Sequence, residues 1–85
     1  MKTFYKYPLI IGDAQVISIP DFSTAHVGLD PSGHVCLWAL VDPTDISVDH
    51  TILIRGTGHA VLDDVCYLGS VTQGHFVWHV FKVVR

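Results

Sequence analysis

Proline, glycine and aspartate divide the sequence into short segments, and most of these segments are rich in Val, Ile and Thr. The branched Cβ atoms of these residues pack well on a pleated sheet and lose rotamer freedom in a helix. Strong helix formers are scarce, because the chain contains no Glu and few Lys, Arg, Gln, Met or Ala residues. The sequence therefore predicts strands throughout.

Seven segments have the length and residue pattern of a strand. They span residues 3–9, 14–19, 25–29, 34–41, 50–55, 66–71 and 75–84, and the last is expected to be the longest. The segment 34–41 is apolar at odd and even positions alike, which is typical of a central strand covered on both faces. Asp30-Pro31-Ser32-Gly33 has the signature of a type I turn and predicts a hairpin. A further turn is expected at Gly12-Asp13.

The whole chain, residues 1–85, fits a single β domain. We expect an all-β fold, either a small antiparallel sandwich or a partly open barrel of about six to seven short strands. A chain of this size buries only about 60% of the surface that its unfolded form exposes, yet 49% of the residues are apolar and 15% are charged. Part of the apolar surface should therefore contact other subunits, so a homo-oligomer is expected.

Charge and hydropathy limit the other partners. The formal net charge is −3, whereas binding a nucleic-acid backbone needs clustered Lys and Arg. The chain has no apolar run of about 18 residues, and residues 1–8 lack the apolar centre of a signal peptide. We therefore expect no nucleic-acid partner, no membrane partner and a cytoplasmic location. Cys36 and Cys66 stand among apolar residues and are predicted to be buried free thiols.

No catalytic set or metal site is evident from the spacing of polar residues. His75 and His79 share a strand face, but they lie about 13 Å apart at ~3.3 Å per residue, too far to ligate one ion. No Ser lies in a Gly-x-Ser-x-Gly motif, and the acidic residues are all Asp, mostly in turns. We expect no catalytic residue, no metal, no cofactor and no enzymatic activity.

The most unusual local motif is Arg55-Gly56-Thr57-Gly58-His59, which ends an apolar segment. Two glycines allow backbone N–H groups to approach an anion closely, and Thr57 adds a hydroxyl. Arg55 offers a planar guanidinium for phosphate or carboxylate, and His59 adds a further donor or a ring. The same pattern also suits a glycine-containing bulge or a strand corner without any ligand.

Aromatic side chains form the second candidate group. Trp38, Trp78 and Tyr7 suit a pocket in which a nucleobase stacks on a ring, although core or subunit-contact roles fit them as well. His79 follows Trp78 in an apolar strand, so a buried His79 needs a hydrogen-bond partner, either from the protein or from a ligand.

Several blocks together resemble a family of small, functionally unassigned proteins of tailed bacteriophages. They are Cys-Leu-Trp-Ala-Leu-Val-Asp-Pro at 36–43, Gly-Thr-Gly-His at 56–59 and Phe-Val-Trp-His-Val-Phe at 76–81, with shorter matches at 5–9 and 67–70. The resemblance carries no catalytic residues to this chain. By analogy with small phage proteins that inhibit host defence, it implies a protein that sequesters a nucleotide immune signal in the host cytoplasm without turnover.

An ADP-ribose-type or cyclic nucleotide is the ligand class that this resemblance implies. Its phosphates would lie on Arg55 and the 56–59 turn, and its base on Trp38, Trp78 or Tyr7. One alternative is a protein-binding inhibitor of a host defence factor, or a virion assembly module, which predicts a large exposed apolar patch. Another is a hydrolase that acts on the same signals.

Overall fold

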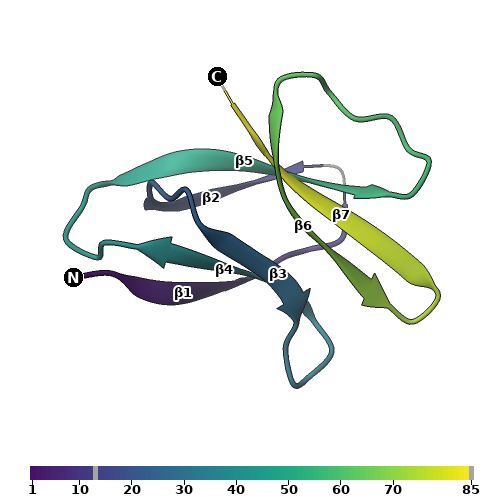
Figure 1. The fold of residues 1–85 in the computed structure, drawn as a ribbon, viewed down its shortest axis with the longest axis horizontal. Helices are drawn as coiled ribbons and strands as arrows, with labels where there is room; N and C mark the ends of the chain where they lie inside the picture. Colours follow the sequence, from purple (N-terminus) through teal and green to yellow (C-terminus); the bar gives the residue numbers. More distant parts are fainter. Residues whose placement is uncertain (13, 85) are drawn as a thin grey trace.

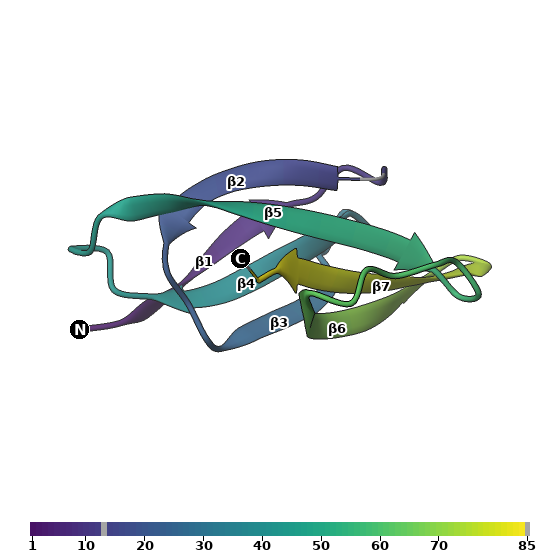
Figure 2. The same cartoon turned by 90° about the horizontal axis from the view of Figure 1, so that it is seen from above.

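The computed structural model describes residues 1–12 and 14–84, which form two packed antiparallel sheets (Figures 1 and 2). The three-stranded sheet has the order β1-β4-β3, and the four-stranded sheet has the order β2-β5-β7-β6. The strands are β1 (Thr3–Pro8), β2 (Ala14–Pro20), β3 (Ala25–Leu29), β4 (Val35–Val41), β5 (Ser47–Gly56), β6 (Val65–Gln73) and β7 (Phe76–Val83). The predicted all-β fold is confirmed, and the sandwich is the arrangement found.

The hairpin between β3 and β4 follows from its turn residues. Gly33 N donates to Asp30 O at 2.9 Å, and Gly33 has a φ of 84°, which favours glycine. The Asp30 carboxylate accepts from Ser32 N and His34 N. The predicted hairpin is therefore confirmed, and β4 lies between β1 and β3 as the expected central strand. The predicted turn at Gly12-Asp13 falls partly on Asp13, which lies outside the described residues.

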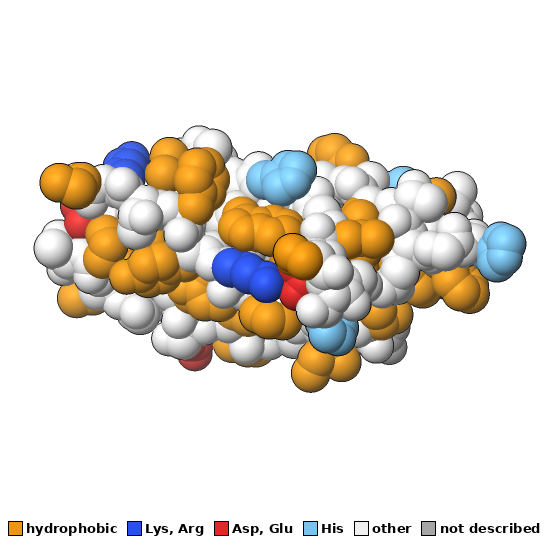
Figure 3. Space-filling model, turned by 90° about the horizontal axis from the view of Figure 1, so that it is seen from below, with side chains coloured by type: hydrophobic (Ala, Val, Ile, Leu, Met, Phe, Trp, Pro, Cys, Tyr) orange, Lys and Arg blue, Asp and Glu red, His pale blue; other side chains and the backbone are white. Residues whose placement is uncertain are grey.

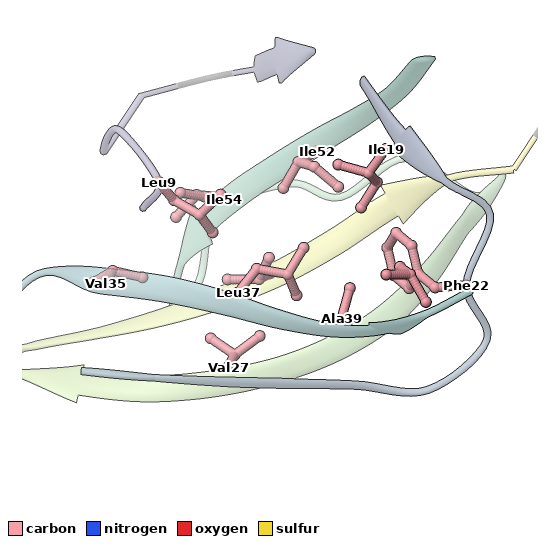
Figure 4. Close-up of a cluster of buried hydrophobic side chains, with 11 residues drawn as sticks. Leu9, Ile19, Phe22, Val27, Val35, Leu37, Ala39, Ile52 and Ile54 are labelled. Atoms are coloured by element: carbon pink, nitrogen blue, oxygen red, sulfur yellow. The ribbon is translucent and has the colours of Figure 1, made fainter. Parts of the chain in front are cut away.

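The core lies between the two sheets and is built from alternate residues of the strands (Figure 4). On β4 the inward side chains are fully buried, and they pack against inward side chains of β5 and β7. Phe22, from the β2–β3 connection, stands at one end of the cluster (Figure 4). The buried set comprises Leu9, Ile19, Phe22, Val27, Val35, Leu37, Ala39, Val41, Ile52, Ile54 and Val80.

Strand β6 approaches β3 closely at Gly69. A register shift between Tyr67 and Gly69 interrupts the pairing of β6 with β7. A Cβ atom at Gly69 would lie 3.1 Å from Cβ of Val27, which is closer than side chains normally pack. Glycine at this position therefore lets the edges of the two sheets meet.

Several sequence-based predictions need correction. The longest strand is β5, which begins at Ser47, and β7 ends at Val83. The extension of β5 follows from a tight turn in which Asp45 N donates to Asp42 O, because the chain reverses sooner than its residue pattern indicated. Cys36 is buried as predicted, but Cys66 is exposed because β6 is an edge strand. Both thiols are free.

The outer face of β4 is less covered than its apolar sequence predicted. Cys36 is buried there, but Trp38 and Leu40 are only half-buried.

No helix long and apolar enough to cross a membrane occurs among the described residues.

Candidate ligand-binding site

The end of β5 and the start of β7 form a groove, which we call the β5–β7 groove. Gly56 pairs with Trp78 in the sheet, so the turn after β5 stands next to the aromatic residues of β7. The groove has a volume of about 350 Å³. Its lining residues are Gly56, Thr57, His59, His75, Phe76, Val77 and Trp78. Four of these residues, Gly56, Thr57, His59 and Trp78, are ones that the sequence predicted for the site.

The turn at the groove is held by hydrogen bonds within the chain. His59 N donates to Gly56 O at 3.1 Å, and Gly56 N donates to His59 Nδ1 at 3.3 Å. Gly58 has a φ of 90°, which side chains rarely adopt. A Cβ atom at Gly56 would lie 3.1 Å from Cε1 of His59, so glycine lets the imidazole close over the backbone. Because Nδ1 accepts, a neutral His59 ring carries its proton on Nε2 and can donate from there.

The other wall of the groove is aromatic. The rings of Phe76 and Trp78 are stacked, with their centroids 5.3 Å apart and their planes 16° apart. Trp78 Nε1 donates to Gln73 Oε1 at 3.0 Å, and Gln73 Nε2 donates to Gly33 O at 3.0 Å. These bonds fix the indole, while Phe76 remains 60% exposed. The wall therefore offers a held ring beside an exposed one.

Thr57 is positioned from the outer face of the four-stranded sheet. Its Oγ1 lies 2.9 Å from Nε2 of His79, and Nδ1 of His79 lies 2.6 Å from Oγ of Ser70. The hydroxyl of Tyr67 continues this chain to Ser70 at 2.5 Å. His79 thus has the hydrogen-bond partners that its position in an apolar strand requires. It orients Thr57 and does not line the groove.

Arg55 adjoins the groove and supports the connection that follows. Its Nε donates to Ala60 O at 3.2 Å, and its Nη1 donates to Ile54 O at 3.0 Å. The bond to Ala60 ties the guanidinium to the loop of residues 57–64, which is visible beyond the sheet in Figure 1, and the bond to Ile54 holds it against β5. Arg55 therefore supports the turn, and it is not among the residues that line the groove.

The structure separates the other two predicted residues from the groove. Tyr7 lies on β1 and packs against the core, where burial raises the pKa of its hydroxyl. Trp38 lies on the outer face of the three-stranded sheet, with its ring 5.6 Å from that of His26. A surface hollow of about 370 Å³ is lined there by Phe4, His26 and Trp38.

Sequence reasoning did not place His75 and Phe76 in the site. The available signal was the alternation of β7, which puts Phe76 and Trp78 on one face, together with the turn that brings His75 beside them. Among the described residues, no group of three or more His, Cys, Asp or Glu is arranged to hold a metal ion.

All 85 residues match the model of a protein family described as a domain of unknown function, DUF7352. The chain belongs to this family. No curated protein and no solved structure matches it. For this DUF7352 domain, the functional argument therefore depends on the geometry of its side chains.

That geometry suits a ligand with two unlike parts. Imidazole and hydroxyl groups of His59, His75 and Thr57 can meet an anionic or polar part. The stacked rings of Phe76 and Trp78 can meet a flat apolar part.

Proposed function

We propose that this protein captures a phosphate-bearing nucleotide in the β5–β7 groove and holds it without turnover. The observation that carries this proposal is the placement of the stacked Phe76–Trp78 pair and the Gly-Thr-Gly-His turn around one hollow. A nucleotide has the two unlike parts that these walls suit, a flat base and an anionic phosphate.

The base would stack on Phe76. Stacking of a nucleobase on an aromatic side chain contributes about 1–3 kcal/mol and tolerates any base. The stacked Trp78 behind it is fixed by Gln73, so little side-chain freedom would be lost on that wall when a base binds.

The phosphate would lie against the turn. His59, His75 and Thr57 line this part of the hollow, and their imidazole and hydroxyl groups are the donors we propose for the phosphate. Thr57 is already oriented by His79, and no atom lies within 4 Å of a Cβ position at Gly58, so the backbone there is open to a close approach. Arg55 is not among the lining residues, so these groups would hold the phosphate, and hydrogen bonds to a charged phosphate are stronger than neutral ones.

In biological terms, we propose a phage-type anti-defence role in the host cytoplasm. The protein would sequester an ADP-ribose-type or cyclic nucleotide immune signal, so that the host effector is not activated. Support comes from the sequence resemblance to small phage proteins and from the nucleotide-like complementarity of the groove. Binding without turnover suits a site in which the Thr57, Ser70 and His79 side chains are engaged with one another.

Isothermal titration calorimetry with ADP-ribose and with cyclic ADP-ribose tests this proposal. We expect saturable heat with at least one of them, a large loss in Phe76→Ala, and recovery of the ligand unchanged after incubation. Val16→Ala is a matched control, because Val16 is similarly exposed but lies on β2 and does not line the groove. Absence of heat with both nucleotides would refute the proposal, and formation of a new product would favour a hydrolase instead.

A second proposal concerns self-association through the outer face of the three-stranded sheet. Phe4, His26 and Trp38 form an exposed hollow there. Figure 3 shows a side of the molecule where hydrophobic side chains recur around one basic and one acidic side chain that adjoin each other near the centre. We propose that a second copy of the chain covers this face, as the high apolar content of a short chain indicates. Native mass spectrometry should show an oligomer that Phe4→Asp dissociates, and a monomeric wild type would refute it.

A further inference from the structure

A second hollow lies at the other end of β5 and β7, and we call it the β5–β7 cavity. Its volume is about 630 Å³, which is within the range of small-molecule sites. Its lining includes Asp21 and Phe22 from the β2–β3 connection, His50 from β5 and Leu68 from β6. Lys82 of β7 and Val84, just after the end of β7, also line it. Neither the predicted site nor the nucleotide proposal uses this cavity.

His50 carries an unused polar group. The residue is 7% exposed, and its Nε2 atom is buried without a hydrogen-bond partner. Its ring packs against Phe22, with the centroids 5.1 Å apart. Buried polar atoms are nearly always hydrogen-bonded, so an unpartnered one calls for an explanation.

Lys82 brings a cation to the same place. It follows Trp78 and Val80 on the inward face of β7, and its side chain is 17% exposed. Its Nζ donates to Phe22 O at 3.2 Å and lies 4.7 Å from the centre of the Phe22 ring. An ammonium has three donors, so Lys82 can serve a further acceptor.

A carboxylate oxygen of the chain marks the point where these two groups converge. Oδ1 of Asp21 lies 3.7 Å from Nζ of Lys82 and 4.0 Å from Nε2 of His50. Both distances exceed those of a hydrogen bond. The Asp21 side chain is 79% exposed, so it approaches the two donors from solvent without closing on them. An anion of similar shape that sits slightly deeper would bind both groups.

We propose that the β5–β7 cavity binds a small monocarboxylate with an apolar body, whose carboxylate takes the place of Asp21 between Lys82 and His50. With Nε2 protonated, His50 donates one hydrogen bond and Lys82 donates another. The apolar body lies against Leu68, Phe22 and Val84. A single negative charge fits better than a phosphate dianion, because Asp49 also lines the cavity and would repel additional charge.

Titration of the isotope-labelled full-length protein with hexanoate, followed by NMR, tests this proposal. We expect saturable shifts at His50 and Lys82, with a Kd on the order of 1 mM for so small a ligand. Hexanamide has the same shape without the charge, and we expect it to bind at least tenfold more weakly. Equal shifts with the amide, or no shifts with hexanoate at several times that concentration, would overturn the proposal.

Two variants make the assignment specific. Asp21→Asn keeps an oxygen that can accept from Phe22 N but removes the competing charge, so hexanoate should bind about two- to fivefold more tightly, the range of an exposed ion pair. Lys82→Met keeps an apolar stem and should weaken binding about tenfold or more. Phe76→Ala, in the β5–β7 groove, should change nothing. Weaker binding or no change in Asp21→Asn would contradict the proposal even if Lys82→Met failed to fold.

Discussion

The two ends of strand β7 differ in how their polar groups are used. Trp78, Val80 and Lys82 follow one another along the inward face, so the strand runs from an aromatic groove through the core to a charged cavity. In the β5–β7 groove, Gly56 N and Trp78 Nε1 have partners within the chain. In the β5–β7 cavity, His50 Nε2 has none. The groove is thus prepared in advance, whereas the cavity keeps an unsatisfied polar atom.

This difference has a thermodynamic consequence. A prepared site loses little conformational freedom when a ligand binds, so its affinity comes mainly from new contacts. An unsatisfied buried polar atom lowers the stability of the free protein, and a ligand that satisfies it restores that stability. Mutations should therefore separate the two ends: those in the groove should reduce affinity alone, and those in the cavity should change stability as well.

The largest effect is expected in the groove. Phe76→Ala should weaken nucleotide binding about 10- to 100-fold, because base stacking contributes about 1–3 kcal/mol. Its melting temperature should stay close to that of the wild type, since the ring is largely exposed. Calorimetry and thermal melts measure the two quantities. If Phe76→Ala lost stability but kept its affinity for the nucleotide, the expected contrast between the groove and the cavity would be wrong.

In the cavity, His50→Leu should raise the free energy of unfolding by about 1 kcal/mol. The change removes a buried nitrogen that has no partner and supplies an apolar side chain beside Phe22. For a domain of this size, the melting temperature should rise by about 4–8 °C. The same variant should lose hexanoate binding and keep nucleotide binding. A clear drop in melting temperature would show that His50 stabilises the free protein, against our account.

A smaller effect is expected from the residue that orients Thr57. His79→Phe removes the hydrogen bonds to Thr57 and Ser70, and we expect nucleotide affinity to fall about three- to tenfold, the worth of one hydrogen bond. Thr57→Val should show the same loss, and the double variant should lose no more than either single one. Additive losses would mean that His79 contacts the nucleotide directly.

The smallest effect on ligand binding is expected from a change in the Lys6–Asp30 pair, which lies outside both the β5–β7 groove and the β5–β7 cavity. The hydrogen bond from Lys6 Nζ, at 2.9 Å, and the backbone N–H of His34 hold the pKa of Asp30 well below its usual range. A carboxyl group whose pKa is lower in the folded protein than in the unfolded chain stabilises the fold at pH values above the unfolded pKa. This stabilisation is lost as the pH falls toward the folded pKa.

In Asp30→Asn, the free energy of unfolding should therefore fall less steeply than in the wild type as the pH drops below about 4. Urea unfolding at several pH values measures it. Nucleotide and hexanoate affinities at neutral pH should not change, and a change in either would mean that the two ends are coupled through the β3–β4 hairpin.

Local features of the fold were readable from the sequence. β-Branched residues mark the strands, and Asp30 and Gly33 fix their hairpin through backbone preferences that depend only on neighbours. The start of β5 and the exposure of Cys66 were not readable, because they depend on how tightly a turn closes and on which strand lies at an edge.

The candidate site was predicted only in part, because its turn is a local feature whereas the placement of its aromatic residues depends on the tertiary arrangement. The pairing of β5 with β7 brings together Gly56, Thr57, His59 and Trp78. The motif at residues 55–59 predicted the turn itself. Tyr7 and Trp38 fell elsewhere, since composition cannot say which sheet or which face an aromatic residue occupies. The cavity was missed because His50 and Lys82 lie in no motif. The alternation of β7, which turns Lys82 inward beside Val80, was the one signal available.

The most direct test uses the fluorescence of Trp78 alone. Trp38→Phe removes the only other tryptophan of the chain, so every change reports on the groove. Addition of ADP-ribose or cyclic ADP-ribose should quench the emission in a saturable way, because the base stacks on the Phe76–Trp78 pair. An unchanged spectrum with both nucleotides, in a folded variant, would contradict nucleotide capture in this groove.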